Sequence, residues 1–192
     1  MADRHIDSTL LDKAINFAVE AHSNTMRKGK GFPYIVHPME AVAIVATITA
    51  DQEMLAAAAL HDVVEDTPTT VDDIRAQFGD RVARLVAAES DPEVVGMSRE
   101  ESWRFRKEVS IRRLASDTRD AKIVALGDKL SNMRAIARDY AVQGDELWQL
   151  FNEKDPAAHA WHYRGLVSAL AELSDTFAYK EFIQLVDQVF GL

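Results

Sequence analysis

One stretch decides the fold: Leu60-His61-Asp62-Val63-Val64-Glu65-Asp66-Thr67. It places one imidazole and three carboxyl groups directly after the apolar run 54–60, whose strong helix formers and lack of a polar face are typical of a buried helix. Charged groups at the end of a buried helix cost free energy unless something compensates them. His61 and Asp62 are adjacent, and Glu65 follows on the same helical face. The stretch is therefore a candidate metal site.

The composition is that of a soluble globular protein. Of the 192 residues, 47% are hydrophobic and 28% are charged, which is enough for one substantial core, and we expect residues 1–192 to form a single domain. The chain has no cysteine, so disulfides, thiolate zinc sites and cysteine nucleophiles are excluded. Any metal must then be held by histidine and carboxylate, a donor set that suits manganese, iron or zinc.

The charge and the N-terminal segment restrict partners and location. A net charge of −9 argues against a general nucleic-acid binder, because duplex binding depends on neutralising phosphates. A small anionic substrate is compatible with this charge if a few cations are focused on it. Residues 1–7 show no basic segment followed by an apolar one, and no run approaches the roughly 20 apolar residues of a membrane span. We expect a cytoplasmic protein that does not bind membranes. The sequence is also compatible with a homo-oligomer.

Helical periodicity dominates the chain, and convincing strands are absent. Apolar residues recur at intervals of three and four over 11–21 and again over 39–50, which predicts two amphipathic or buried helices. Ser98 and Glu101 have the spacing of a capping box for a long helix that ends near Leu114. Residues 24–34 are basic and contain glycine and proline, so they are predicted to form a loop that could hold phosphate or a base. The pattern predicts an all-α bundle of orthogonally packed helices.

Four polar residues lie among apolar neighbours: His37, His61, Asp62 and Asp128. They come from three predicted helices, and helical bundles build metal sites from facing helices. Each also has a simpler interpretation, since His37 could cap a helix and His61-Asp62 could be a local hydrogen-bonded pair. Asp128 is harder to explain, because a buried carboxylate without a partner shifts its pKa upward and becomes neutral. The residues alone leave a shared metal site and separately satisfied groups both open.

Read in order, these four residues resemble the H…HD…D signature of the HD-domain metal-dependent phosphohydrolases. The similarity extends beyond the signature to the segments 27–28, 33–38, 57–67, 78–79 and 126–134. These segments resemble the hydrolase domain of RelA/SpoT proteins, the (p)ppGpp 3′-pyrophosphohydrolases. The length of the chain is similar to that of stand-alone small alarmone hydrolases.

The resemblance implies a role for each matching residue. The ligands of one divalent ion, manganese in the family, would be His37, His61, Asp62 and Asp128. The acidic pair that positions and deprotonates the attacking water would be Glu65 and Asp66. Contacts to the nucleotide would come from Arg27, Lys28, Tyr34 and Asn132, with Lys129 and Arg134 as weaker candidates for neutralising phosphate.

The first hypothesis is therefore manganese-dependent hydrolysis of (p)ppGpp to GDP or GTP and pyrophosphate. Three departures from the family pattern concern the pocket rather than the metal ligands: Gly29 in a lengthened loop, Gly127 in place of alanine, and the segment 89–91. They leave two alternatives open. The chain could hydrolyse another phosphorylated nucleotide, such as the 2′-phosphate of NADPH or a nucleoside phosphate, or it could be a non-catalytic nucleotide-binding HD module.

Several other features are given structural interpretations. The basic residues within 104–113 are predicted to form a solvated helix face, from which one or two members could reach the pyrophosphate. Trp103, Trp148 and Trp161 are predicted to be core or interface anchors. His22 continues the apolar stripe of the first helix and is expected to pack near the site.

Replacing Asp128 tests the metal hypothesis directly. We expect Asp128→Ala to abolish metal binding and hydrolysis together, because the remaining donors would lose a charged ligand. Metal content and phosphate release measured on the same preparation check this. Hydrolysis that persists in metal-free Asp128→Ala would contradict the assignment.

Overall fold

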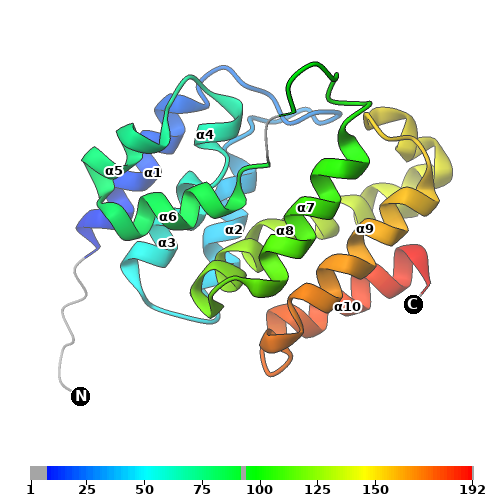
Figure 1. The fold of residues 1–192 in the computed structure, drawn as a ribbon. Helices are drawn as coiled ribbons and strands as arrows, with labels where there is room; N and C mark the ends of the chain where they lie inside the picture. The colour runs from blue at the N-terminus through cyan, green and yellow to red at the C-terminus, as the bar shows by residue number, and fades with distance from the viewer. Residues whose placement is uncertain (1–7, 92–93, 192) are drawn as a thin grey trace.

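The computed structural model describes residues 8–91 and 94–191, and this part of the chain is helical with no named strand, which confirms the predicted all-α class (Figure 1). The expectations for residues 1–7 lie outside it. The α-helices are α1 Thr9–Ala21, α2 Val36–Ala46, α3 Gln52–Leu60, α4 Val63–Asp66, α5 Val71–Phe78, α6 Asp80–Glu89, α7 Trp103–Ser116, α8 Arg119–Gln143, α9 Pro156–Ala169 and α10 Phe177–Phe190. Two short 3-10 helices, Gly144–Leu150 and Ala171–Leu173, follow α8 and α9.

One predicted helix start is displaced. The side chains and backbones of Ser98 and Glu101 form the reciprocal bonds of a capping box, yet α7 begins only at Trp103. In a continuous helix the carbonyl oxygen of Arg99 would accept from the backbone N–H of Trp103, four residues later. Here it accepts from the Arg106 guanidinium instead, at 2.9 Å. The N–H of Trp103 donates to Glu100 instead. The capping box therefore closes a turn, and the helix starts later.

The centre of the fold is α3. All seven residues of 54–60 are buried, as predicted, and Ala56 to Ala59 are fully inaccessible to solvent. The helix packs against α1, α2, α6 and α8, and its small side chains let these neighbours approach closely. Asp51 begins the helix, since its Oδ1 accepts from the backbone N–H groups of Glu53 and Met54 at 3.0 and 3.1 Å. A helix held this firmly fixes the position of His61 at its end.

The longest helix, α8, runs between two groups of helices (Figure 1). The helices α1, α3, α5 and α6 lie on one side of it, and α9 and α10 lie on the other. It contacts α2 most extensively and also packs on α10, while α7 packs on α9. None of the described helices is long and apolar enough to cross a membrane.

Gly127 allows α8 to touch α2. A Cβ atom at this position would lie 2.7 Å from Val45 Cγ2 and 3.0 Å from the carbonyl oxygen of Ala41. This close approach accounts for the glycine at position 127. It also brings the next residue, Asp128, against the first turn of α2.

Gly127→Ala should lower the free energy of unfolding. The cost of overpacking, about 1–3 kcal/mol, exceeds the gain in helix propensity, about 1 kcal/mol. Denaturant unfolding checks this, with Gly31→Ala as the control because a Cβ at Gly31 would meet nothing within 4 Å. Equal or greater stability of Gly127→Ala would contradict the close approach.

Candidate active site

Four polar side chains from three helical regions converge in the core: His37 from α2, His61 and Asp62 after α3, and Asp128 from the middle of α8. The Nε2 atoms of the two histidines lie 3.2 Å apart. Asp128 Oδ1 lies 3.1 Å from His37 Nε2, and Asp62 Oδ2 lies 3.0 Å from His61 Nε2 and 3.3 Å from His37 Nε2. Both imidazoles and Asp128 are buried. The structure thus brings together the four residues that the sequence singled out.

Hydrogen bonds to the outer ring nitrogens orient both histidines. His61 Nδ1 lies 2.8 Å from the carbonyl oxygen of Ala58, which can only accept, so Nδ1 carries the proton. His37 Nδ1 lies 2.8 Å from Ser131 Oγ, and that hydroxyl donates to Glu40 at 2.8 Å, so it accepts from His37. In the neutral tautomers that these bonds favour, each Nε2 carries the lone pair and faces the other Nε2. Facing lone pairs and two carboxylates form a donor set that fits a divalent cation.

The electrostatics of the cluster favour positive charge. Burial would lower the pKa of His61, but the Asp62 and Asp128 carboxylates raise it well above its ordinary value. Despite their own burial, the pKa values of Asp62 and Asp128 are held well below the ordinary range, with His61 the leading favourable neighbour of Asp62 and Lys129 that of Asp128. Both carboxylates are therefore ionised and available as ligands.

Neighbouring side chains hold the two carboxylates in place. The Tyr34 hydroxyl donates to Asp62, and the side-chain amide of Asn132 donates to Asp128. Burial and the Asp62 charge raise the pKa of Tyr34 far above its ordinary value, so it stays protonated and remains a donor. His22 is buried and its ring centroid lies 4.8 Å from that of Tyr34. His22 thus packs near the site, as expected.

Glu65 and Asp66 lie one turn beyond Asp62, on the short helix α4, and line the same cavity. Burial, reinforced by the Asp91 charge, raises the pKa of Glu65. Burial and the Asp62 charge raise the pKa of Asp66. Both groups are therefore stronger bases than ordinary carboxylates.

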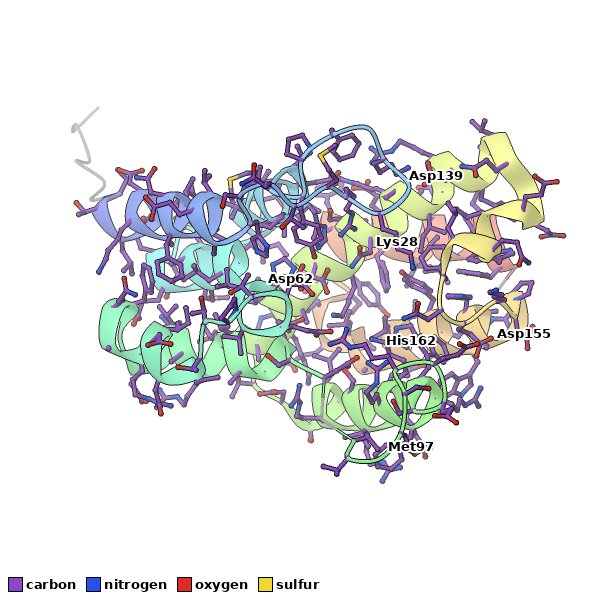
Figure 2. The ribbon with its side chains drawn as sticks, turned by 90° about the horizontal axis from the view of Figure 1, so that it is seen from above. Lys28, Asp62, Met97, Asp139, Asp155 and His162 are labelled. Carbon is purple, nitrogen blue, oxygen red and sulfur yellow. The ribbon has the colours of Figure 1, made fainter. Side chains whose placement is uncertain are left out.

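A cavity of about 400 Å³ opens beside the four donors. The expected substrate contacts that line it are Arg27, Lys28, Tyr34, Lys129 and Asn132. Figure 2 shows three labelled side chains around the middle of the molecule: Asp62, Lys28 from the segment before α2, and His162 from α9. The cavity is thus bordered by segments that lie far apart in the sequence.

Arg134 does not join this group. Its guanidinium donates to both oxygens of Glu181, at 2.6 and 2.7 Å, and to Glu40 at 3.3 Å, and it does not line the cavity. Asn132 follows Asp128 by four residues and shares its face of α8, whereas Arg134 follows by six and points elsewhere. Its structural role is to bind α2 and α10 to α8.

Sequence reasoning missed one wall of the cavity. Trp103, Lys107 and Ser110 line it from α7, and their spacing of four and three was a signal of a shared face. Further lining residues come from α6, the segment after it, the end of the first 3-10 helix and α9: Glu89, Asp91, Phe151, His159, His162 and Tyr163. These follow no pattern in the sequence, because tertiary packing alone unites them.

The prediction of a solvated face on α7 is wrong for Arg106, whereas Lys107 lines the cavity, as the prediction allowed for one or two members. Arg106 is buried and donates to Asp91 at 2.6 Å, while Lys107 lies 2.9 Å from the same carboxylate. The segment after α6 supplies a carboxylate that the α7 sequence alone could not reveal. Trp103 and Trp148 are buried, in agreement with their prediction as core anchors.

The fold and the donor cluster define the class of protein. The HD-domain family matches residues 14–157, and the chain belongs to this family. Two solved structures share its architecture. A metazoan orthologue of SpoT, described as hydrolysing ppGpp, has a TM-score of 0.75 at 24% identity over 97% of this chain and 99% of that one. A Listeria monocytogenes protein has a TM-score of 0.71 at 28% identity over 84% and 99%.

Several curated relatives of the chain are named guanosine-3′,5′-bis(diphosphate) 3′-pyrophosphohydrolase. The MESH1 protein of Danio rerio is 36% identical over 135 residues, covering 68% of this chain and 71% of that protein. The MESH1 protein of Homo sapiens is 37% identical over 136 residues, covering 69% and 72%. The protein of Aquifex aeolicus is 36% identical over 126 residues, and the match spans 66% of this chain but only 18% of that longer protein.

Ser131 should control metal affinity without touching the metal. Ser131→Ala removes the acceptor that fixes the His37 tautomer, so we expect Mn²⁺ to bind about 10- to 100-fold more weakly. Titration with Mn²⁺ measures this, and Ser168→Ala, an exposed serine on α9, is the control. Unchanged affinity in Ser131→Ala would show that the hydrogen bond does not orient His37.

Proposed function

We propose that the protein is a manganese-dependent (p)ppGpp 3′-pyrophosphohydrolase. The observation that carries this proposal is the convergence of two imidazole lone pairs and two carboxylates at one side of a cavity that also holds a basic carboxylate pair. In the reaction, water adds to the phosphorus attached to the ribose 3′-oxygen. The bond between that phosphorus and the 3′-oxygen breaks, giving GDP or GTP and pyrophosphate. The names of the curated relatives support the same substrate.

The charges around the cavity support a requirement for a divalent cation. Among the described residues that line it, seven are carboxylates and five are lysine or arginine. A polyanionic nucleotide would therefore meet a surplus of negative charge. A divalent ion held by His37, His61, Asp62 and Asp128 would lower the pKa of water and shield phosphoryl oxygens.

Glu65 and Asp66 are suited to orienting the attacking water and accepting its proton. Each is partly or largely buried and has a raised pKa, which brings a general base closer to the pH at which the protein works. Arg99 donates to Glu65 Oε1 at 3.1 Å and leaves the other oxygen, Oε2, for water.

The nucleotide end of the substrate fits the wall formed by the segment before α2. The guanidinium carbon of Arg27 lies 5.3 Å from the centre of the Tyr34 ring, and the guanidinium donates to Asn132. Such a planar group can stack on a base or bind phosphate. Lys30 pairs with Asp139 and so fastens this segment to α8. Lys28 lines the cavity without an ion pair among the described residues.

We also propose that residues 1–192 form a single domain that acts in the cytoplasm on a small nucleotide, with neither nucleic acid nor membrane as partner. A homo-oligomer is compatible with this proposal. The main rivals are an HD phosphohydrolase for another phosphorylated nucleotide and a non-catalytic nucleotide-binding module.

Product analysis separates these functions. The Mn²⁺-loaded protein and a metal-stripped control are incubated with ppGpp, pppGpp, NADPH and nucleoside monophosphates. The proposal predicts metal-dependent release of pyrophosphate from ppGpp and pppGpp alone. Orthophosphate from another substrate would overturn the nucleotide assignment, and no product from any of them would favour the binding module.

Glu65→Gln tests the general base. We expect turnover to fall by roughly 100- to 10,000-fold while Mn²⁺ still binds, because the amide cannot accept a proton. In the wild type, activity should decline as the pH falls through the pKa of Glu65. Since burial raises that pKa, the decline should begin above the pH at which an ordinary glutamate titrates.

The control for this experiment is Glu108→Gln, which changes an exposed glutamate on α7. Its turnover should equal that of the wild type. A Glu65→Gln protein with normal turnover would exclude Glu65 as the base.

A further inference from the structure

Two of the five cations that line the cavity, Lys30 and Lys129, are already neutralised by carboxylates. Lys30 pairs with Asp139. Lys129 lies between two carboxylates, Asp128 and Glu89, the latter at 3.2 Å. These two lysines therefore bring no surplus of positive charge to a substrate. The positive charge available to an anion must come from elsewhere on the wall.

Around Asp91, cations outnumber carboxylates. Its Oδ2 accepts from Arg106 at 2.6 Å and from Lys107 at 2.9 Å, so two cations share one carboxylate. Arg106 is buried and also donates to Ser102 Oγ, at 3.3 Å, and to the carbonyl oxygen of Arg99. Arg106 neutralises Asp91 from a position that does not line the cavity. One net positive charge is left, and it resides on the ammonium group of Lys107.

Lys107 is placed to use that charge. Its side chain lines the cavity and is 26% exposed, and only one of its three N–H donors is used by Asp91. Ser110 lies three residues later, on the same face of α7, and also lines the cavity. The described residues provide no hydrogen-bond partner for the Ser110 hydroxyl. An ammonium and a hydroxyl side by side can hold the oxygens of one phosphate group.

The cavity consequently has two separate positively charged regions, each called a positive pole below. Arg27 and Lys28 form one, on the segment before α2. Lys107 forms the other, on α7, which packs against α9, the helix that carries His162. Figure 2 shows Lys28 and His162 as separate labelled positions beside Asp62, a residue of the donor cluster. A substrate with one anionic group at the reacting centre needs no second pole, whereas a 3′-diphosphate carries a phosphate beyond that centre.

We propose that Lys107 and Ser110 bind the distal phosphate of the 3′-diphosphate, and that this subsite makes the protein selective for a diphosphate over a monophosphate. The proposal rests on the proposed function and adds the group that recognises the leaving pyrophosphate. Arg106 acts as a positioning residue, because it keeps Asp91 paired and so leaves the ammonium of Lys107 free to turn toward the substrate.

Binding of inorganic pyrophosphate and of orthophosphate tests the subsite independently of hydrolysis. The Mn²⁺-loaded wild type is titrated with each anion, alongside Lys107→Met, Lys107→Arg and Arg112→Met. Lys107→Met leaves Asp91 paired with Arg106, so it strands no buried charge. Arg112 is a matched control, since it is an exposed cation of α7 whose partner is Glu108.

We expect Lys107→Met to bind pyrophosphate roughly 10- to 100-fold more weakly, the range for losing a charge-assisted hydrogen bond, with orthophosphate affinity unchanged. Lys107→Arg should recover most of the loss, and Arg112→Met should match the wild type. Equal weakening for both anions, or none for pyrophosphate, would overturn the proposal.

A kinetic comparison gives the second readout. Hydrolysis of ppGpp by Lys107→Met should lose the same factor in kcat/KM, whereas a guanosine nucleotide with a 3′-monophosphate should not distinguish the variant from the wild type. If the wild type hydrolyses neither nucleotide, the proposed function fails, and the pyrophosphate titration still decides whether the subsite exists. Equal kinetic losses on both nucleotides would contradict a distal-phosphate contact.

Discussion

The structure depends on two imidazole lone pairs that face each other inside the core. The Nε2 atoms of His37 and His61 lie 3.2 Å apart, and hydrogen bonds on their Nδ1 atoms prevent either ring from simply turning its proton inward. The carboxylates of the buried Asp128 and the partly exposed Asp62 lie next to them. With both rings neutral this arrangement is repulsive, so the centre of the fold favours a positive charge between the rings, supplied either by a proton or by a metal cation.

The helices around this centre are packed to maintain that arrangement. The alanines of α3 let four other helices approach, and the absence of a side chain at Gly127 lets α8 touch α2. Either helix displaced by a few tenths of an ångström would separate ligands that come from different elements. The site therefore depends on dense packing of the core, because its ligands come from different helices. This dependence explains the glycine and alanine residues at the centre of the fold.

The charged side chains around the cavity are largely paired with one another. Carboxylates outnumber cations along its wall, and most of the lysines are paired. The site therefore cannot attract a nucleotide by bulk charge, which fits the acidic composition of the whole chain. Attraction of an anionic nucleotide has to come from a bound metal ion and from a few positions where cations outnumber carboxylates. Asp91, which is shared by two cations, is one such position.

The sequence was sufficient to predict the all-α class and the positions of the candidate ligands, because buried helices and polar interruptions such as Asp128 leave periodic signals. The caps at Asp51 and Thr70 are also local, because each side chain accepts from the first N–H groups of its own helix. The sequence could not predict the partner of Arg106 or the wall formed by α7 and α9, since these contacts join residues with no sequence relation. Arg134 shows the same limit, because its partners Glu40 and Glu181 lie on other helices.

The central claim is that the four donors form one binding point for a divalent cation. An anomalous-difference map from crystals grown with Mn²⁺ tests it most directly. We expect one strong peak per chain within about 2.3 Å of both Nε2 atoms and of a carboxylate oxygen from each of Asp62 and Asp128. A map with no peak there at saturating Mn²⁺, or with its only peak elsewhere, would contradict the claim.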